Sequence, residues 1–450
     1  MMRSSTSTGI DVGAVQLEAV DTTPMTQRLT RALAAWGMFS LPALAVSVPK
    51  GVLPFGIVLL VTTVLMARRM GEGIAPIVRP LSWLSLAVAL AIGVALVSSI
   101  RLGLDPGDVD NLDRLIAMLW ATLWAYVLQP PRAALWWGAL VGIAAAFALA
   151  LGQVLGGAPR ASGWGNAIVF ADVVLLLMVL AVFCRPRRSW MWTVAALVVG
   201  VGAILLSGTR GTWPALLVLL VTLVLGCGWR SRRSRALLLG GLIVAAVAVV
   251  MSVPAMREQT RLAELRQDIV RMDRGDNNSS AGARMERLEV ATQAFLAHPM
   301  TGVGFVHFDL AMTAVPECAD PVHAGEERCH LGHAHNDLAE WAATMGIPGV
   351  IALLAIYGIP LWLFAQLRHR AEPAGQLRGA ANAGLMLVVA FVLCGLTQSM
   401  FAHQTTTSVY ASLVGLLMGL ALREAGVGRT DGRRVSSETA LAVRMPTPHR

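Results

Sequence analysis

Ionisable and amide side chains gather in one segment, HAHNDLAEWAATMGIPG at residues 333–349, of a chain otherwise rich in alanine, leucine and valine. Asp337 is followed three residues later by Glu340, as in a helix capping box, so we expect a short helix to begin at Asp337 and to end at Gly346. His335 then stands just before a helix N-terminus, whose positive end favours a neutral imidazole. Because a general base must be unprotonated, His335 is a candidate catalytic base.

Two arginine-bearing segments could join His335. Arg210 lies in SGTRGTW, a short turn between apolar runs, and Arg284 lies in ARMERLEV with Arg287 one helical turn further on. An arginine near a membrane edge is often a lipid contact, and that is the alternative for each of them. Arginine is also the side chain best shaped to hold phosphate oxygens in pairs. One neutral histidine and two fixed cations would suit a transfer in which a hydroxyl loses its proton while a pyrophosphate leaves.

A metal site is the other chemical interpretation of HLGHAH at residues 330–335, with Cys329 or Glu340 as a further ligand. His333 and His335 are only two residues apart in an irregular segment, and neither an HExxH motif nor a second ligand pair at zinc spacing is present. We therefore expect neither a metal nor another cofactor. A purely structural role for His335 is the remaining alternative.

The composition indicates an integral membrane protein. Hydrophobic residues make up 56% of the 450 residues and charged residues 14%, and the mean hydropathy is +0.63. Soluble domains do not reach these values, so we expect an all-α polytopic fold with about twelve membrane helices. The apolar runs are 33–48, 51–67, 80–100, 113–129, 133–155, 164–184, 189–207, 212–229, 236–253, 347–367, 379–400 and 405–422. Residues 1–28 are polar and do not have the form of a cleavable signal peptide.

Positive charges predict the orientation, because they favour the cytoplasmic side of short loops. The loops after even-numbered helices carry Arg68, Arg69, Arg79, Arg132, Arg185, Arg187, Arg188, Arg230, Arg232, Arg233, Arg235, Arg368, Arg370 and Arg378. The short loops after odd-numbered helices carry Lys50, Arg101, Arg114, Arg160 and Arg210. Both termini are therefore expected in the cytoplasm and the active site on the periplasmic face. The net charge of +9 then reflects topology and attraction to anionic lipid, and no nucleic-acid partner is needed.

The expected organisation has five parts. These are a cytoplasmic tail at 1–28, membrane helices one to nine within 29–253, an external catalytic loop at 254–346, membrane helices ten to twelve within 347–422, and a cytoplasmic tail at 423–450. Asp172 falls inside the sixth predicted helix, where it could pair with a basic group or be protonated, and we keep it out of the catalytic set.

The external loop is predicted to be partly helical. Residues 256–274 have the pattern of an amphipathic helix on the membrane surface, and a second helix is expected at 282–297 with Leu288, Ala291 and Phe295 on one apolar stripe. A sharp turn is expected in TGVGF at 301–305. Cys318 and Cys329 could form a disulfide in an oxidising periplasm, against the alternative of free or metal-binding thiols.

Three motifs together resemble those of bacterial O-antigen ligases. His335 and Asn336, nine further residues, Gly346, two residues and Gly349 are similar to the H[NSQ]x9Gxx[GTY] signature of that family. RMERL at 284–288 resembles its RxxxL motif, and SGTRG resembles the arginine-bearing segment of a superfamily that also contains O-antigen polymerases and bacterial O-linked oligosaccharyltransferases.

The resemblance implies a glycosyltransferase of the GT-C kind in the bacterial inner membrane. Its donor would be O-antigen on undecaprenyl pyrophosphate and its acceptor a sugar hydroxyl of the lipid A core. His335 carries over as the base, Arg210 and Arg284 as pyrophosphate clamps, and Asn336 and Arg287 as supporting groups. His333 would either shape the loop or share the acceptor's proton. Inversion by a single displacement, without a metal, would follow.

Other functions remain open at this point. An O-antigen polymerase would use the same donor chemistry with another carrier-linked glycan as acceptor, and a protein O-oligosaccharyltransferase would glycosylate a polypeptide. A polytopic transporter is the alternative outside the enzymes. Such a transporter would place polar groups along a path through the membrane centre, whereas here they gather on one external face.

Overall fold

All regular elements in the described part of the chain are helices. The computed structural model describes residues 24–103, 110–226, 270, 280–319, 332–371 and 377–428. Within these ranges five helices are long and apolar enough to cross a membrane: α3 (Ala67–Arg101), α6 (Ala133–Leu155), α8 (Trp190–Ser207), α16 (Asp337–Ala371) and α18 (Gln404–Glu424). Shorter apolar helices accompany them: α2 (Leu53–Leu65), α7 (Ala167–Phe183), α9 (Trp213–Gly226) and α17 (Ala380–Gly395). The prediction of an all-α polytopic membrane protein is confirmed.

The centre of the bundle is apolar and tightly packed. Helices α7 and α18 are buried over almost their whole length, and α18 packs along α5 (Ile116–Leu128). Gly415 and Gly419 of α18 face α5 one turn apart, and a Cβ on Gly415 would lie 2.5 Å from the Met118 carbonyl oxygen. Small residues at this spacing let two membrane helices approach closely. Helix α1 (Pro24–Leu44) packs against α6 and α2.

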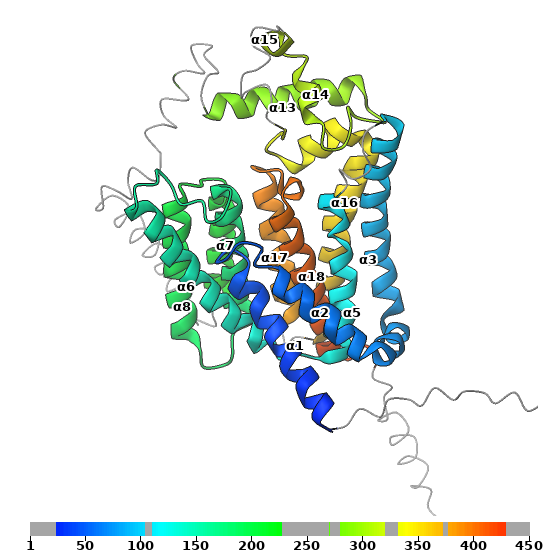
Figure 1. Ribbon diagram of the computed structural model, residues 1–450, viewed down its shortest axis with the longest axis vertical. Coiled ribbons are helices and arrows are strands. Elements are labelled where there is room, and N and C mark those ends of the chain that lie inside the picture. The colour runs from blue at the N-terminus through cyan, green and yellow to red at the C-terminus, as the bar shows by residue number, and fades with distance from the viewer. Residues whose placement is uncertain are drawn as a thin grey trace, which may run out of the picture.

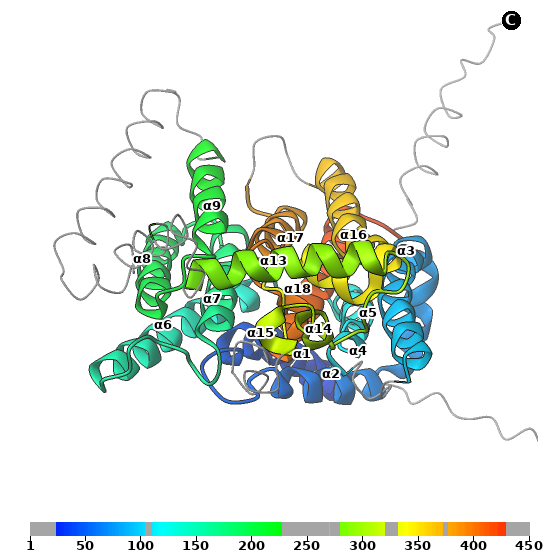
Figure 2. The same cartoon turned by 90° about the horizontal axis from the view of Figure 1, so that it is seen from above.

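Several connections between helices meet at one end of the bundle. Ala161 of the α6–α7 connection donates its N–H to the carbonyl of Leu206 at the end of α8, 2.9 Å away. The side chain of Asn111, in α4 (Asp110–Asp113), donates to the carbonyl of Ala402 in the connection between α17 and α18. Helix α13 (Ser280–Ala297) lies across this end of the bundle, as Figures 1 and 2 show. We call this end of the bundle the α13 end.

The helix predicted at 282–297 is confirmed by α13, but its buried stripe is different. Leu288 and Phe295 are only partly buried, whereas Arg287, Val290 and Ala294 face inward with Ala291. The apolar residues pack on α14 (Phe308–Met312), α15 (Pro316–Ala319) and the start of α16. The tertiary contacts of α13 therefore decide which of its residues are buried, and they place Arg287 toward the interior. The helix predicted at 236–253 lies outside the described residues, and so does the helix predicted at 256–274 apart from residue 270.

Several predicted helix boundaries are wrong; α1, for example, begins at Pro24 and not at residue 33. Residues 68–79 were expected in a loop, but they form the first part of α3, where Arg68 makes an i,i+4 ion pair with Glu72 at 3.0 Å. Such a pair stabilises a helix. The arginines of this segment had been assigned to a loop because of their charge alone. The helix predicted at 379–400 ends at Gly395, because the next residues turn and a short 3₁₀ helix, η3 (Met400–Ala402), follows. We call residues 396–403 the 396–403 loop.

The short helix predicted after His335 is the first part of α16, and Gly346 separates it from the membrane segment. Gly346 has φ +65° and ψ −155°, which are not helical angles, so α16 is kinked at this residue. The N–H of Ile347 donates to the Pro299 carbonyl at 2.7 Å, and Val303 and Gly304 donate to Ala343 and Thr344. The turn after α13 thus satisfies the last carbonyls of the short helix.

Replacing Gly346 with alanine is expected to destabilise the α13 end. A Cβ at this position would overlap the Pro299 carbonyl oxygen, and the positive φ is unfavourable for alanine. We expect Gly346→Ala to lower the free energy of unfolding by about 1–3 kcal/mol, measured by thermal unfolding in detergent. Gly358→Ala is the matched control, since a Cβ on this glycine of the same helix meets no atom within 4 Å. Equal melting temperatures for the two variants would contradict the prediction.

Candidate active site

Asp337 fixes the 396–403 loop against α16. Its carboxylate is 2% exposed and accepts hydrogen bonds from the Tyr357 hydroxyl at 2.6 Å and from the Met400 N–H at 2.8 Å. A buried carboxylate without such partners would be very unfavourable. These bonds therefore hold a loop of the C-terminal region at the start of α16.

Glu340 and Asn336 order the residues around His335. Glu340 accepts hydrogen bonds from the Ala334 N–H and from the Ser399 hydroxyl. The side-chain oxygen of Asn336 accepts from the Ala339 N–H at 3.0 Å, and its amide nitrogen donates to the Leu396 carbonyl. The N-cap is thus Asn336 and not Asp337 as expected, because the carboxylate of Asp337 is engaged by the loop instead.

His335 faces Gln398 of the 396–403 loop. His335 has φ +54°, a conformation uncommon for a residue with a side chain, and its Nδ1 lies 2.5 Å from the Gln398 amide oxygen. The amide nitrogen of Gln398 lies 2.7 Å from Nε2 of His403. With the amide in this orientation, Nδ1 of His335 carries the proton and Nε2 is left with a lone pair.

Three imidazoles share this site and are held neutral. The rings of His333 and His403 meet edge to face with their centroids 5.5 Å apart. Burial lowers the pKa of His335 to about 4; the hydrogen bond to Gln398 raises it, and the charges of Arg287, Arg284 and His333 lower it further. Burial likewise lowers the pKa of His403 to about 4 and lowers the pKa of His333. The neutral form of His335 was predicted from the helix terminus, but desolvation is the first cause.

Helix α13 brings its two arginines to these histidines. Arg287 is 6% exposed, and burial followed by the charge of Arg284 lowers its pKa. The charge of Arg287 acts on both His333 and His335, and that of Arg284 acts on His335. Arg287, which the resemblance gave only a supporting role, is therefore the more buried of the two cations at this site.

Arg210 lies on a turn that borders the same loop. A Cβ on the neighbouring Gly211 would overlap the Thr397 side chain, so the α8–α9 turn packs directly beside Gln398. Arg160 of the α6–α7 connection donates to the Thr209 hydroxyl at 3.3 Å, which adds a further cation near Arg210. The structure thus gathers His333, His335, Asn336, Arg284 and Arg287 in one cluster, with Arg210 on an adjoining turn.

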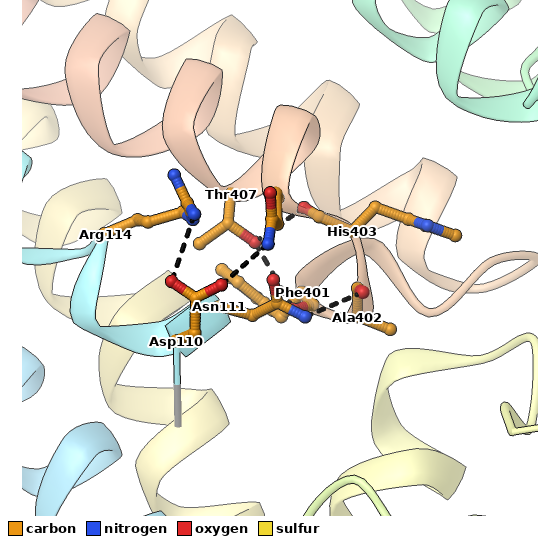
Figure 3. A network of polar contacts seen from close by, with 8 residues as sticks. Asp110, Asn111, Arg114, Phe401, Ala402, His403 and Thr407 are labelled. Atoms are coloured by element: carbon orange, nitrogen blue, oxygen red, sulfur yellow. Dashed lines mark hydrogen bonds and ion pairs between the residues drawn. The ribbon is translucent and has the colours of Figure 1, made fainter. Parts of the chain in front are cut away.

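Helix α4 anchors the far side of the loop, as Figure 3 shows. Asp110 accepts from Arg114 at 3.1 Å and from the side chain of Gln404 at 2.7 Å, while Asn111 donates to the Ala402 carbonyl. In this view the His403 ring points away from Arg114. The loop is thereby held from two directions, by α16 and by α4.

Gln398 and His403 are site residues that the sequence interpretation missed. They lie in LTQSMFAHQ, residues 396–404, where a run of polar side chains interrupts two apolar stretches. These polar residues were a signal for a loop, but the helix predicted at 379–400 extended over the first of them.

The other predicted residues are placed as follows. Cys318 is disulfide-bonded and buried beside α13, while Cys329 lies outside the described residues, so their pairing stays a prediction. Asp172 is buried in α7, where the Cys394 thiol hydrogen-bonds to it. Within the described ranges no three His, Cys, Asp or Glu side chains are arranged to hold a metal ion.

The neutral histidines make a prediction about stability and pH. Since the pKa of His335 and that of His403 lie near 4 in the folded protein against an ordinary 6.5, the unfolded chain binds more protons between these values. Through these histidines stability should fall as pH is lowered from about 6.5 toward 4.5, whereas burial raises the pKa of Asp337 to about 8 and that of Glu340 to about 7, so these two carboxyl groups change stability in the opposite direction over the same window. The histidine contribution is therefore measured as a difference between proteins, from melting temperatures across this window. The stability of the wild type relative to His403→Gln should fall as pH is lowered, whereas its stability relative to His298→Gln, just beyond the end of α13, should stay constant; a constant difference between the wild type and His403→Gln would contradict the account.

Comparison with known proteins agrees with the resemblance seen in the motifs. Residues 195–354 match the family model described as O-antigen ligase. The matched region runs from α8 to α16 and contains Arg210, Arg284 and His335, whereas Gln398 and His403 lie beyond it. No curated protein sequence matches the chain. The site described above thus lies largely within the matched region, and this match supports an O-antigen ligase-type protein.

Proposed function

We propose that this protein transfers a completed O-antigen chain from undecaprenyl pyrophosphate to a sugar hydroxyl of the lipid A core. In this proposal it is a GT-C-type glycosyltransferase of the bacterial inner membrane, with both termini in the cytoplasm and the α13 end in the periplasm. One observation carries the proposal: a partly buried His335, held neutral and bonded through Nδ1 to Gln398, has the lone pair of Nε2 available near the cations of α13.

The chemistry follows from that arrangement. His335 Nε2 takes the proton of the acceptor hydroxyl as its oxygen attacks the anomeric carbon. The bond from that carbon to the pyrophosphate oxygen breaks on the opposite face, so the configuration inverts. The leaving pyrophosphate keeps the bonding electrons, and Arg284, Arg287 and Arg210 would balance its charge. The proton then passes from His335 to solvent.

Gln398 would support the base throughout this step. Its amide oxygen accepts the Nδ1 proton of His335, which fixes the ring orientation and the tautomer. The same oxygen stabilises the imidazolium when Nε2 becomes protonated. Gln398 is therefore a positioning residue in this mechanism, acting through His335.

Reconstitution tests the reaction. Purified protein in liposomes, with undecaprenyl-pyrophosphate-linked glycan and lipid A core, should transfer glycan in the presence of a chelator. His335→Ala should reduce the rate by about 10²–10⁴-fold, the usual contribution of a general base, and Arg210→Ala or Arg284→Ala should also lower it severely. His298→Ala serves as the control. Wild-type transfer by His335→Ala would refute the assignment, and extension of the carrier-linked glycan in place of transfer to lipid A core would point to a polymerase.

Changes at Gln398 test the positioning role. Gln398→Leu removes the acceptor for Nδ1–H and should lower kcat by about 10–100-fold with little change in the KM for either substrate. Gln398→Glu keeps an acceptor for Nδ1–H but places a carboxylate beside the ring, which raises the pKa of His335 from about 4. The acid limb of its rate profile should therefore move to higher pH. An unmoved acid limb together with a wild-type rate in Gln398→Leu would exclude this role.

A further inference from the structure

A cavity of about 660 Å³ lies at the α13 end, separate from the cluster around His335. Its walls are the α1–α2 turn, the residues 162–166 before α7, and the first turn of α18. Its size is typical of a cavity that takes a small ligand or the headgroup of a larger one.

The cavity carries positive charge. Lys50 and Arg114 line it, and none of the described lining residues is an Asp or Glu. Asp110 lies behind Arg114, with one carboxylate oxygen on Arg114 and the other on Gln404, so it positions both side chains at the wall. Since Asp110 balances the charge of Arg114, Lys50 supplies the net positive charge. The turn that carries Lys50 is held by a hydrogen bond from the Leu53 N–H to the Lys50 carbonyl at 2.9 Å. Phosphate and carboxylate groups are the natural ligands of such a pair.

One wall has the features of a saccharide platform. Trp164 is 59% exposed, and its indole N–H donates to the Ser47 carbonyl at 3.0 Å, which fixes the ring beside the α1–α2 turn. The side chain of Gln153 binds the backbone of Ser162 and Gly163 and so makes this loop rigid. An indole face combines an apolar surface with little loss of conformational entropy on binding.

The cavity adjoins the catalytic cluster through the 396–403 loop. Gln404 lines the cavity and directly follows His403, which is bonded to Gln398 and through it to His335. The arginines of α13 lie at the histidine cluster and would take the leaving pyrophosphate of the donor. The cations of the cavity are then available to a second anionic substrate.

We propose that this cavity binds the anionic saccharide headgroup of the acceptor glycolipid. Its phosphate or carboxylate groups contact Lys50 and Arg114, and a sugar ring lies on Trp164. The identity of the ligand as the acceptor rests on the proposed function, whereas the affinity for an anionic saccharide rests on the cavity alone.

Equilibrium binding to the full chain in zwitterionic nanodiscs tests this directly. The probes are lipid A core, the same glycolipid after removal of its phosphates, and undecaprenyl-pyrophosphate-linked glycan. Lys50→Ala should weaken binding of the phosphorylated acceptor about tenfold, the effect of one charge-assisted contact, and leave donor binding unchanged. Lys50→Arg keeps the charge and should bind as the wild type does. Arg101→Ala, which removes a cation of the same end outside this cavity, should have no effect on the acceptor.

Further binding measurements distinguish the ways in which the proposal could fail. Trp164→Ala should weaken the phosphorylated and the dephosphorylated acceptor alike. The proposal is overturned if Lys50→Ala leaves acceptor binding unchanged, if it weakens the donor instead, or if vesicles of phosphatidylglycerol compete as well as the acceptor does. Transfer assays on the same samples then test the reaction: Lys50-dependent binding without any transfer would refute the proposed function and leave the binding proposal standing.

Discussion

The buried carboxylate of Asp337 joins two parts of the chain that are far apart in sequence. It accepts hydrogen bonds from Tyr357 within α16 and from the backbone of Met400 in the 396–403 loop. Three residues further along the same helix, Glu340 binds the N–H of Ala334 and the hydroxyl of Ser399. The segment that carries His335 and the loop that carries Gln398 are thereby both fixed to the start of α16. The rest of the site depends on this arrangement, since His335 keeps its orientation only while both sides stay in place.

The spacing of the His335 motif has a physical explanation in these terms. Asn336 caps a short helix, and Gly346 ends it with a positive φ where Pro299 approaches. Gly349 begins the membrane segment where a Cβ would lie 2.6 Å from the carbonyl oxygen of Trp341. The interval between the histidine and the two glycines is therefore the length of one helix that carries Asp337 and Glu340 inward. The glycines let the turn after α13 dock, and α13 in turn brings Arg287 to the histidines.

Local patterns in the sequence were sufficient for some of these features. The short helix, its end at Gly346 and the helix now seen as α13 all followed from caps and periodicity. The partners of His335 did not, because Gln398 is 63 residues away and its loop sits between two apolar runs that read as continuous helix. The inward orientation of Arg287 was also missed, since an apolar stripe through Leu288 seemed sufficient. Both errors have one cause: contacts distant in sequence decide burial, and periodicity within one segment does not contain them.

The central claim is that His335 and the arginines of α13 and of the α8–α9 turn surround one reacting bond. The most direct measurement is a cryo-EM structure of the protein with an unreactive phosphonate analogue of the undecaprenyl-pyrophosphate-linked donor. The account predicts diphosphonate oxygens about 3 Å from the guanidinium groups of Arg287 or Arg284 and of Arg210, with Nε2 of His335 directed toward the anomeric carbon. A diphosphonate bound away from these arginines, or an anomeric carbon on the side of Nδ1, would contradict it.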